Sequence, residues 1–276
     1  TDAFLITGQE ELEEEPLKER IKGAKMLIVE DNDSLREMLA GLFSPYYEVL
    51  TAADGEEGLQ KGREEQPDII LSDVVMPRMT GTELCKEIKS DMDLSHIPVI
   101  FLTAKNDIDS KINGLKIGAE AYVEKPFSFN YLKTQIVSLL YNRQKEREAF
   151  SKRPFFPTNK MQMNKVDEEF MNKVIRTIEE NIIDTNLNVE HLAEILGMSR
   201  SSLLRKIKML SNLSPVDFIR LIRLRKAAEL IHEGKYLIGD ICFMVGINSP
   251  SYFSKLFLKQ FGMTLSLIHI SEPTRL

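Results

Sequence analysis

The sequence lacks the features that would place the chain in a membrane or in an oxidising compartment. No apolar run approaches the ~18 residues that a membrane-spanning helix needs, and the N-terminus opens on Thr1-Asp2-Ala3 and an acidic stretch instead of a secretory signal. The two cysteines, Cys85 and Cys242, have no metal-type spacing and are too few for a disulfide framework. These absences predict a cytoplasmic chain with reduced thiols and no direct membrane contact.

An initiator methionine and an even distribution of charge are also missing. The chain begins at Thr1, and we therefore expect a fragment or a processed chain. Residues 1–156 carry 20 Lys and Arg against 29 Asp and Glu, a net charge of −9. Residues 157–264 carry 15 against 12, a net charge of +3. With 276 residues, this asymmetry predicts two domains with different partners.

Short apolar runs alternate with amphipathic stretches in the first half of the chain. Five such pairs predict parallel strands with helices on both faces, an α/β doubly wound sheet of flavodoxin-like type. The predicted strands are 26–30, 47–52, 68–72, 97–103 and 119–124. The predicted helices are 33–43, 55–65, 81–90, 107–117 and one that begins near Phe129 and continues through charged residues 143–148. Arg153-Pro154 then ends that helix.

The second half of the chain has a helical pattern throughout and no strand alternation. The predicted helices are 167–182, 189–196, 199–210, 215–232, 238–245 and 250–260. Two turns within this part have the same chemistry, because a short helix ends at Gly197 or at Gly246 and a serine, Ser199 or Ser249, caps the next helix. Two helices joined by such a turn form a helix-turn-helix motif, and this all-α part contains two of them.

Polar residues stand at the C-terminal ends of the predicted strands. In an open parallel sheet that edge is where strand-end residues converge on a ligand. The set contains three carboxylates, one hydroxyl, one aromatic residue and one ammonium, and comprises Glu30, Asp31, Asp73, Thr103, Tyr122 and Lys125. A single carboxylate at a strand end is usually a solvated loop residue. Six polar residues at matching strand ends favour a site for a divalent cation and a phosphoryl group.

Asp73 is the predicted centre of this site, because a carboxylate attacks a phosphoryl group when a cation neutralises the repulsion between the two anions. Mg²⁺ prefers oxygen ligands and keeps several waters. Its predicted protein ligands are Glu30, Asp31, Asp73 and the backbone carbonyl of Val75. Lys125 would pair with the phosphoryl oxygens, and Thr103 would donate a hydrogen bond to one of them. An aspartyl-phosphate hydrolase would need an acid at position 75, and Val75 cannot transfer a proton.

Residues 25–142 resemble the receiver domain of bacterial response regulators. The resemblance is carried by Val29-Glu30-Asp31, Ser72-Asp73-Val74-Val75-Met76-Pro77, Leu102-Thr103-Ala104 and Tyr122-Val123-Glu124-Lys125-Pro126. It implies that a histidine kinase phosphorylates Asp73, that Thr103 and Tyr122 form a switch pair, and that the Lys125–Pro126 bond is cis. One variation is present, since the acidic pair is Glu-Asp in place of Asp-Asp.

Residues 165–264 resemble the DNA-binding domain of AraC-type transcription regulators, most clearly in Asn248-Ser249-Pro250-Ser251-Tyr252-Phe253. The resemblance implies two recognition helices in successive major grooves, about 34 Å apart. The predicted DNA contacts are Arg200, Ser201, Ser202, Leu204, Arg205 and Lys206 on the first helix, and Pro250, Ser251, Tyr252 and Lys255 on the second. Arg205 is the preferred base reader, because a guanidinium pairs with guanine O6 and N7.

The basic residues of helix 215–232 are ambiguous. They are Arg220, Arg223, Arg225 and Lys226, and each of them has even odds between contacting DNA and a structural role. We expect at least one of them to form a salt bridge within the domain.

Residues 265–276 depart from the AraC pattern and read as a non-native tail, so that the last helix of the family is missing. Residues 1–24 read as an acidic linker and 143–164 as a helical extension with a Pro-containing linker.

Together the two domains predict a non-enzymatic transcription regulator of a two-component system, which binds double-stranded DNA and forms a homodimer on phosphorylation. The parent chain is a stand-alone regulator or a hybrid sensor kinase. The alternative is a phosphorelay receiver whose helical domain binds DNA weakly or not at all.

Overall fold

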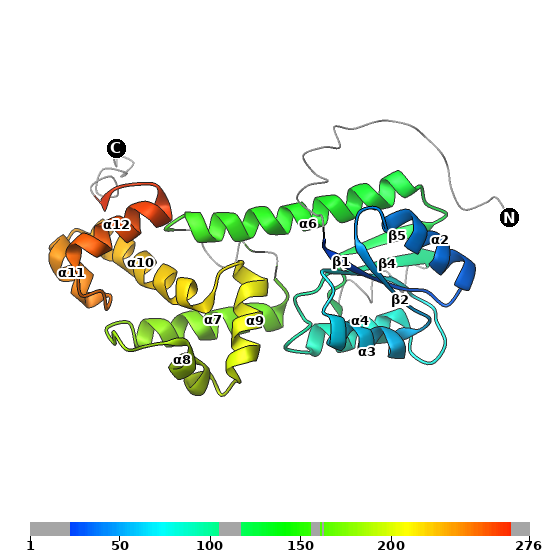
Figure 1. Cartoon of the computed structure of the whole chain (residues 1–276), viewed down its shortest axis with the longest axis horizontal. Coiled ribbons are helices and arrows are strands. Elements are labelled where there is room, and N and C mark those ends of the chain that lie inside the picture. The colour runs from blue at the N-terminus through cyan, green and yellow to red at the C-terminus, as the bar shows by residue number, and fades with distance from the viewer. Residues whose placement is uncertain (1–22, 105–116, 156–160, 162, 266–276) are drawn as a thin grey trace. The chain divides into compact units, whose positions relative to one another are not determined.

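The computed structural model describes residues 23–104, 117–155, 161 and 163–265 (Figure 1). The chain divides into two compact units, residues 1–141 and residues 142–276. The predicted acidic linker up to residue 22 and the predicted tail from residue 266 lie outside the described residues. Within the described ranges no helix combines the length and the apolarity that crossing a membrane requires.

The first unit is built on a five-stranded parallel sheet. Its strands are β1 (Lys25–Val29), β2 (Glu48–Ala52), β3 (Ile69–Asp73), β4 (Val99–Ala104) and β5 (Ala121–Lys125). All neighbouring pairs are parallel and the order is β2-β1-β3-β4-β5, the flavodoxin-like order. The predicted fold class is therefore confirmed, with each strand within two residues of its expected place.

Helices cover both faces of this sheet, because successive strand residues point to opposite sides. Leu27 and Val29 of β1 pack on one side with α4 (Gly81–Ser90), while Met26 and Ile28 pack on the other with α2 (Asp33–Phe43). The remaining described helices of this unit are α3 (Gly55–Glu65) and the start of α6 (Phe129–Lys152). The predicted helix 107–117 falls almost entirely on residues 105–116, outside the described part.

Side-chain caps define where the helices of this unit begin. Asn32 caps α2, and the Asp54 carboxylate accepts the Glu56 and Glu57 amides at the start of α3. At α4, the Thr80 hydroxyl accepts the Glu83 amide while the Glu83 carboxylate accepts the Thr80 amide. Such reciprocal capping satisfies amides that the first turn leaves open.

The second unit is helical in every described element. It contains α7 (Lys165–Glu180), α8 (Val189–Leu196), α9 (Arg200–Ser211), α10 (Pro215–Glu233), α11 (Ile238–Met244) and α12 (Pro250–Phe261), each within two residues of its prediction. One buried core joins these helices, and it includes Phe218 of α10, Phe257 of α12 and Leu192 of α8.

The core of the second unit extends further toward the N-terminus than the predicted DNA-binding domain. Phe150, in the last turn of α6, is fully buried in this core, and Met161 is 7% exposed there. The Phe150 ring stacks on Phe218 with centroids 6.0 Å apart. The segment predicted as an extension and linker, residues 143–164, thus contributes side chains to the folded helical unit.

Candidate functional site

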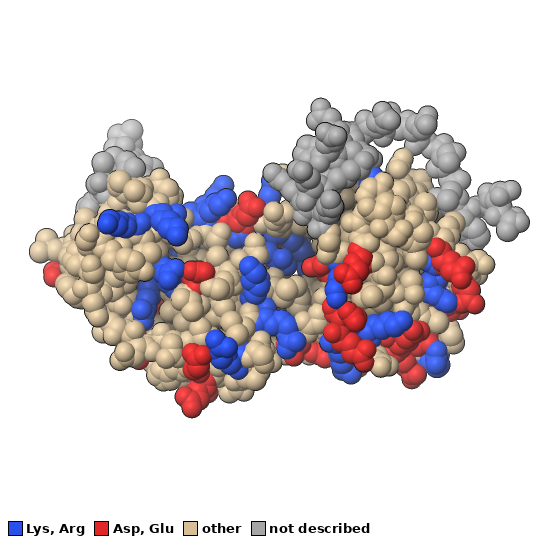
Figure 2. All heavy atoms as spheres, in the orientation of Figure 1, with Lys and Arg blue, Asp and Glu red and all other residues tan. Residues whose placement is uncertain are grey.

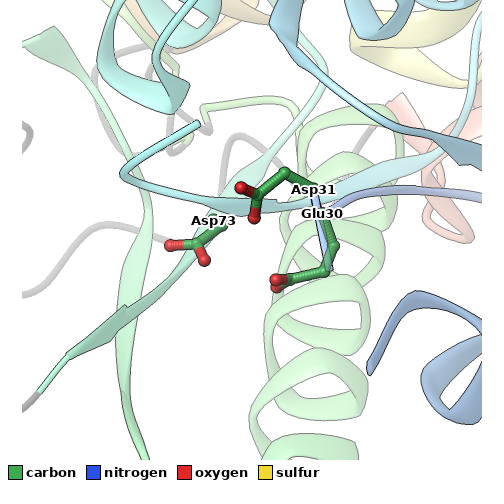
Figure 3. Close-up of side chains that lie close together, drawn as sticks. All are labelled: Glu30, Asp31 and Asp73. Carbon is green, nitrogen blue, oxygen red and sulfur yellow. The ribbon is translucent and has the colours of Figure 1, made fainter. Parts of the chain in front are cut away.

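Three carboxylates meet at the C-terminal edge of the sheet. Glu30 and Asp31 directly follow β1 and Asp73 ends β3, and the two strands pair with Val29 opposite Ser72. The three side chains lie close together in Figure 3, and each offers an oxygen within 4.8 Å of the others. Glu30 is buried, Asp73 is partly buried and Asp31 is exposed. The cluster therefore has a closed inner side and an open outer side.

Lys125, at the end of β5, connects two of these carboxylates. Its Nζ donates to Asp73 Oδ2 at 2.7 Å and to Glu30 Oε2 at 2.8 Å. The Lys125–Pro126 bond is cis, as the family resemblance implies. The other oxygen of Asp73, Oδ1, accepts the Val74 amide at 2.6 Å. Both oxygens of Asp73 are thus held in fixed directions.

Burial and charge compete at this site. Burial raises the pKa of Glu30, and the hydrogen bond from Lys125 opposes that rise. Burial acts to lower the pKa of Lys125, but its hydrogen bonds to Asp73 and Glu30 outweigh that effect, and the net shift is upward. Lys125 therefore stays charged, and it neutralises one of the three carboxylates formally present.

The remaining formal charge of about −2 and the oxygen donors fit a hard divalent cation. Glu30, Asp31 and Asp73 have carboxylate oxygens close enough together to share one ion. Asp31, on the open side, leaves that position accessible to solvent. Val75 is two residues past Asp73 with a side chain that is 71% exposed, and the role of its carbonyl as a ligand stays a prediction.

Thr103 lies on β4, which pairs with β3, and Tyr122 lies on β5, which pairs with the other side of β4. Thr103 is buried at the end of β4, and Tyr122 on β5 is half-buried. The Tyr122 ring lies 5.3 Å from the Phe101 ring, and burial raises the pKa of its phenol. Among the described residues, the buried Tyr122 hydroxyl has no hydrogen-bond partner. The coupled movement of Thr103 and Tyr122 stays a prediction.

Two residues beside the site were missed by the sequence analysis. Gly81 begins α4, and a Cβ there would lie 1.9 Å from the Asp73 carbonyl oxygen. Arg36 of α2 donates from Nη1 to the Glu30 carbonyl at 2.7 Å, and so fixes the backbone beside the acidic pair. A glycine at the first helical position after Thr80 was the visible signal for Gly81. The sequence gives no comparable signal for Arg36.

The second unit contains two helix-turn-helix motifs. In the first, α8 ends at Gly197 with φ 68°, and the Ser199 hydroxyl caps α9 by accepting the Ser202 amide at 3.1 Å. In the second, Gly246 has φ 70° after α11, and Ser249 caps α12 in the same way. The duplicated turn chemistry predicted from the sequence is present in the structure.

Most of the predicted DNA contacts lie on the outer faces of α9 and α12. Arg200, Ser201 and Arg205 are exposed and Ser202 is half-buried on α9. The contacts predicted on α12, namely Pro250, Ser251, Tyr252 and Lys255, are all exposed. Arg200 forms an ion pair of 2.6 Å with Glu190 of α8. Whether these residues contact DNA stays a prediction.

Two of the predicted contacts on α9 face inward. The Lys206 side chain is 0% exposed and forms an ion pair with the buried Asp167 of α7. The prediction that Lys206 contacts DNA is therefore wrong for this fold, because its ammonium lies inside the unit. Leu204 is half-buried and packs against the core, which restricts the DNA contact predicted for it.

The basic residues of α10 have structural partners. Arg220 pairs with Asp217 at 2.6 Å and Lys226 with Glu229 at 2.9 Å, which confirms the expected salt bridge within the domain. Arg223 donates from Nη1 to the Gly246 carbonyl at 3.2 Å. Arg225 donates to the Phe150 carbonyl at 2.7 Å, and burial lowers its pKa to about 10.

The two units differ in the charges on their surfaces. On the face shown in Figure 2, acidic side chains gather over the first unit, whereas Lys and Arg side chains predominate over the second. This distribution follows the charge asymmetry of the sequence, and it places basic side chains on the unit that contains the two helix-turn-helix motifs.

Comparison with known proteins yields two family matches in the chain. Residues 26–137 match the response regulator receiver domain, and residues 192–268 match a helix-turn-helix domain. The protein named histidine kinase P4 from Formosa agariphila is 38% identical over 241 residues, which are 87% of this chain and 18% of that protein. The alkaline phosphatase synthesis transcriptional regulatory protein PhoP of Bacillus subtilis is 38% identical over 117 residues, 42% of this chain and 48% of that protein.

A signal receiver domain of a histidine kinase from Syntrophus aciditrophicus has a solved structure. The two sequences are 33% identical, and the match covers 44% of the present chain and 92% of the Syntrophus chain, with a TM-score of 0.41. The present chain spans about half the length of the regulator PhoP, and a smaller part of histidine kinase P4. Residues 26–137 lie within the first unit, and residues 192–268 lie within the second. The chain thus contains a response regulator receiver domain followed by an AraC-type helix-turn-helix domain.

Proposed function

We propose that the chain is a phosphorylation-controlled, sequence-specific DNA-binding transcription regulator whose phosphoacceptor is Asp73. The observation that supports this most directly is the Asp73 carboxylate, which lies 2.7 Å from the Lys125 ammonium and shares a cluster with Glu30 and Asp31. Together with the two family matches, this arrangement supports a receiver that controls a DNA-binding domain.

In the proposed reaction, an Asp73 carboxylate oxygen attacks the phosphorus of a phosphohistidine. A P–O bond forms and the P–N bond breaks, and the kinase histidine leaves as a neutral imidazole after it takes up a proton. Lys125 Nζ already lies against Asp73 Oδ2 and is placed to pair with a phosphoryl oxygen. When bound, Mg²⁺ would neutralise the negative charge of the phosphoryl group, and Glu30, Asp31 and Asp73 would hold it.

The phosphoryl group carries close to two negative charges, and these replace the single charge of the Asp73 carboxylate. Lys125 then gains a stronger acceptor and shifts its hydrogen bond away from Glu30. Thr103, buried on the adjacent strand, would turn toward the phosphoryl oxygen, and Tyr122 would fill the space that it leaves. A homodimer formed through the surface around Tyr122 of β5 would then place two DNA-binding domains on paired sites.

The proposed phosphodonor is a histidine kinase, either in trans or on the same parent chain. The match of 87% of this chain to part of a protein named histidine kinase P4 supports the second source. The similarity to the transcriptional regulatory protein PhoP supports transcription as the output.

The test combines labelling with DNA binding. A small phosphodonor and Mg²⁺ should label the wild-type chain at Asp73 and leave Asp73→Asn unlabelled. Asp33→Asn is the matched control, because Asp33 is exposed and pairs with Arg36 outside the cluster. Duplexes selected from a random library by the phosphorylated chain should bind it more tightly than they bind Asp73→Asn. Labelling of Asp73→Asn, or equal binding by both proteins, would contradict the proposal.

A further inference from the structure

A buried ion pair joins α9, the first proposed recognition helix, to α7. Lys206 of α9 and Asp167 of α7 are 39 positions apart, and their side chains are 0% and 1% exposed. The Lys206 ammonium bonds to Asp167 Oδ1 and lies 5.9 Å from the Phe170 ring centroid. Both charges are thus withdrawn from solvent inside the helical unit.

Asp167 is itself held in place by the cap of α7. The Asn164 side-chain amide donates to Asp167 Oδ2 at 2.8 Å, and the Asp167 backbone amide donates to Asn164 Oδ1 at 2.9 Å. The carboxylate therefore has little freedom to follow Lys206 if α9 rotates. The ion pair ties α9 to a fixed point at the start of α7.

Stability alone does not explain this pair. Burying two charges is costly, and a well-packed apolar pair of similar size is often as stable or more stable. The second helix-turn-helix provides that comparison, because Ser199 and Ser249 cap their helices at equivalent positions. Leu256 of α12 occupies the position that Lys206 has in α9, and it packs against the core. A recognition helix of this unit therefore packs without a buried charge.

The position of Lys206 on α9 gives the pair a geometric consequence. Lys206 shares the inward face with Leu203 and Ile207, while Arg205, the adjacent residue, is exposed. Apolar contacts tolerate small rotations and slides, whereas a hydrogen-bonded ion pair has defined directions and distances. Fixing the Lys206 side chain toward Asp167 therefore fixes the direction in which the Arg205 side chain projects from α9.

We propose that the buried Lys206–Asp167 ion pair is a positioning element that sets the orientation of α9 for base readout. This inference rests on the proposed DNA-binding function. Lys206 acts through Arg205 and its exposed neighbours, and it does not touch DNA itself. The same role is absent from α12, where Leu256 replaces the charge.

The test uses the double variant Lys206→Leu/Asp167→Asn, which removes both charges together and leaves neither one buried alone. Each variant is bound to selected duplexes and to single-base mutants of them over a range of salt. The base pairs that α9 and α12 read are located by the loss of preference in Arg205→Ala and in Lys255→Ala. Lys208→Ala, an exposed change on the same helix, is the matched control.

The double variant should fold, with base discrimination at the α9 positions reduced about tenfold, since one good base contact is misdirected. Discrimination at the α12 positions and the salt slope should match the wild type. A salt slope lower by about one would show a phosphate contact and overturn the proposal. Unchanged discrimination in a folded double variant would show that the pair only stabilises the fold.

Two further results decide the remaining cases. Should the double variant fail to fold, Lys206→Arg keeps the charge and enlarges the side chain, and the proposal requires it to alter preference at the α9 positions alone. Unchanged preference in that variant would overturn the proposal. Absence of sequence-specific binding by the wild-type chain would instead overturn the proposed function, and the positioning role with it.

Discussion

Phe150 provides a quantitative test of where the helical unit begins. It is fully buried, stacks on Phe218, and has the Arg225 guanidinium 4.1 Å from its ring centroid. Replacing a buried phenylalanine by alanine costs about 3–5 kcal/mol, because the lost transfer energy is joined by a cavity. The cation–π contact accounts for about 0.5–2 kcal/mol of that loss. Phe150→Ala should therefore lower the free energy of unfolding of the helical unit by about 3–5 kcal/mol.

The assay is urea unfolding of the full chain, followed by circular dichroism and by amide hydrogen exchange in α7 and α10. Phe155→Ala is the matched control, because Phe155 lies five residues away and is 51% exposed. That change should stay within about 0.5 kcal/mol of the wild type. Hydrogen exchange should accelerate in the helical unit of Phe150→Ala and remain unchanged in β1 and β3. Equal effects of the two substitutions would refute the assignment of Phe150 to the core.

Two other predictions follow from burial and close packing. Gly81→Ala should slow phosphorylation of Asp73 at least tenfold, because its Cβ would lie 1.9 Å from the Asp73 carbonyl oxygen. Gly41→Ala, which has open space around its Cβ, should be phosphorylated at the wild-type rate. The measurement is the rate of phosphorylation of each variant. Burial raises the pKa of Cys85 to about 12 from 9.0. Since only the unfolded chain loses this proton near pH 9, the contribution of Cys85 to stability is complete below pH 9 and is lost as the pH rises toward 12. Urea unfolding across that range should show a loss that is smaller in Cys85→Ala.

The strand ends could be predicted because their pattern is local. Each apolar run is short and is followed by a polar residue, and the parallel order then requires Glu30, Asp73 and Lys125 to share one edge. The helix ends could be predicted for the same reason, since Ser199 and Gly197 have their effects within a few residues. Gly81 shows where this reasoning stops. Its importance comes from the approach of α4 to the Asp73 backbone, which is a property of packing.

Phe150 could not be assigned from the sequence because its neighbours hide it. Residues 143–148 are mostly charged, and the Arg153-Pro154 break follows closely, so the segment has the composition of a linker. Burial of Phe150 depends on Phe218 and Arg225, which are more than 60 residues further along the chain. Only the tertiary structure shows that the last turn of α6 completes the helical core.

The buried partner of Lys206 could not be assigned from the sequence either. A lysine in the run Arg205-Lys206-Ile207-Lys208 is usually a solvated side chain or a phosphate contact, and nothing near it in sequence identifies a partner. Its position, three residues after Leu203 and one before Ile207, does lie on the apolar stripe of α9. A lysine on an apolar stripe requires a buried acidic partner, because an unpaired ammonium in a core is strongly destabilising. The stripe therefore raises the question of a partner, and Asp167, which lies 39 residues earlier, answers it only in the folded chain.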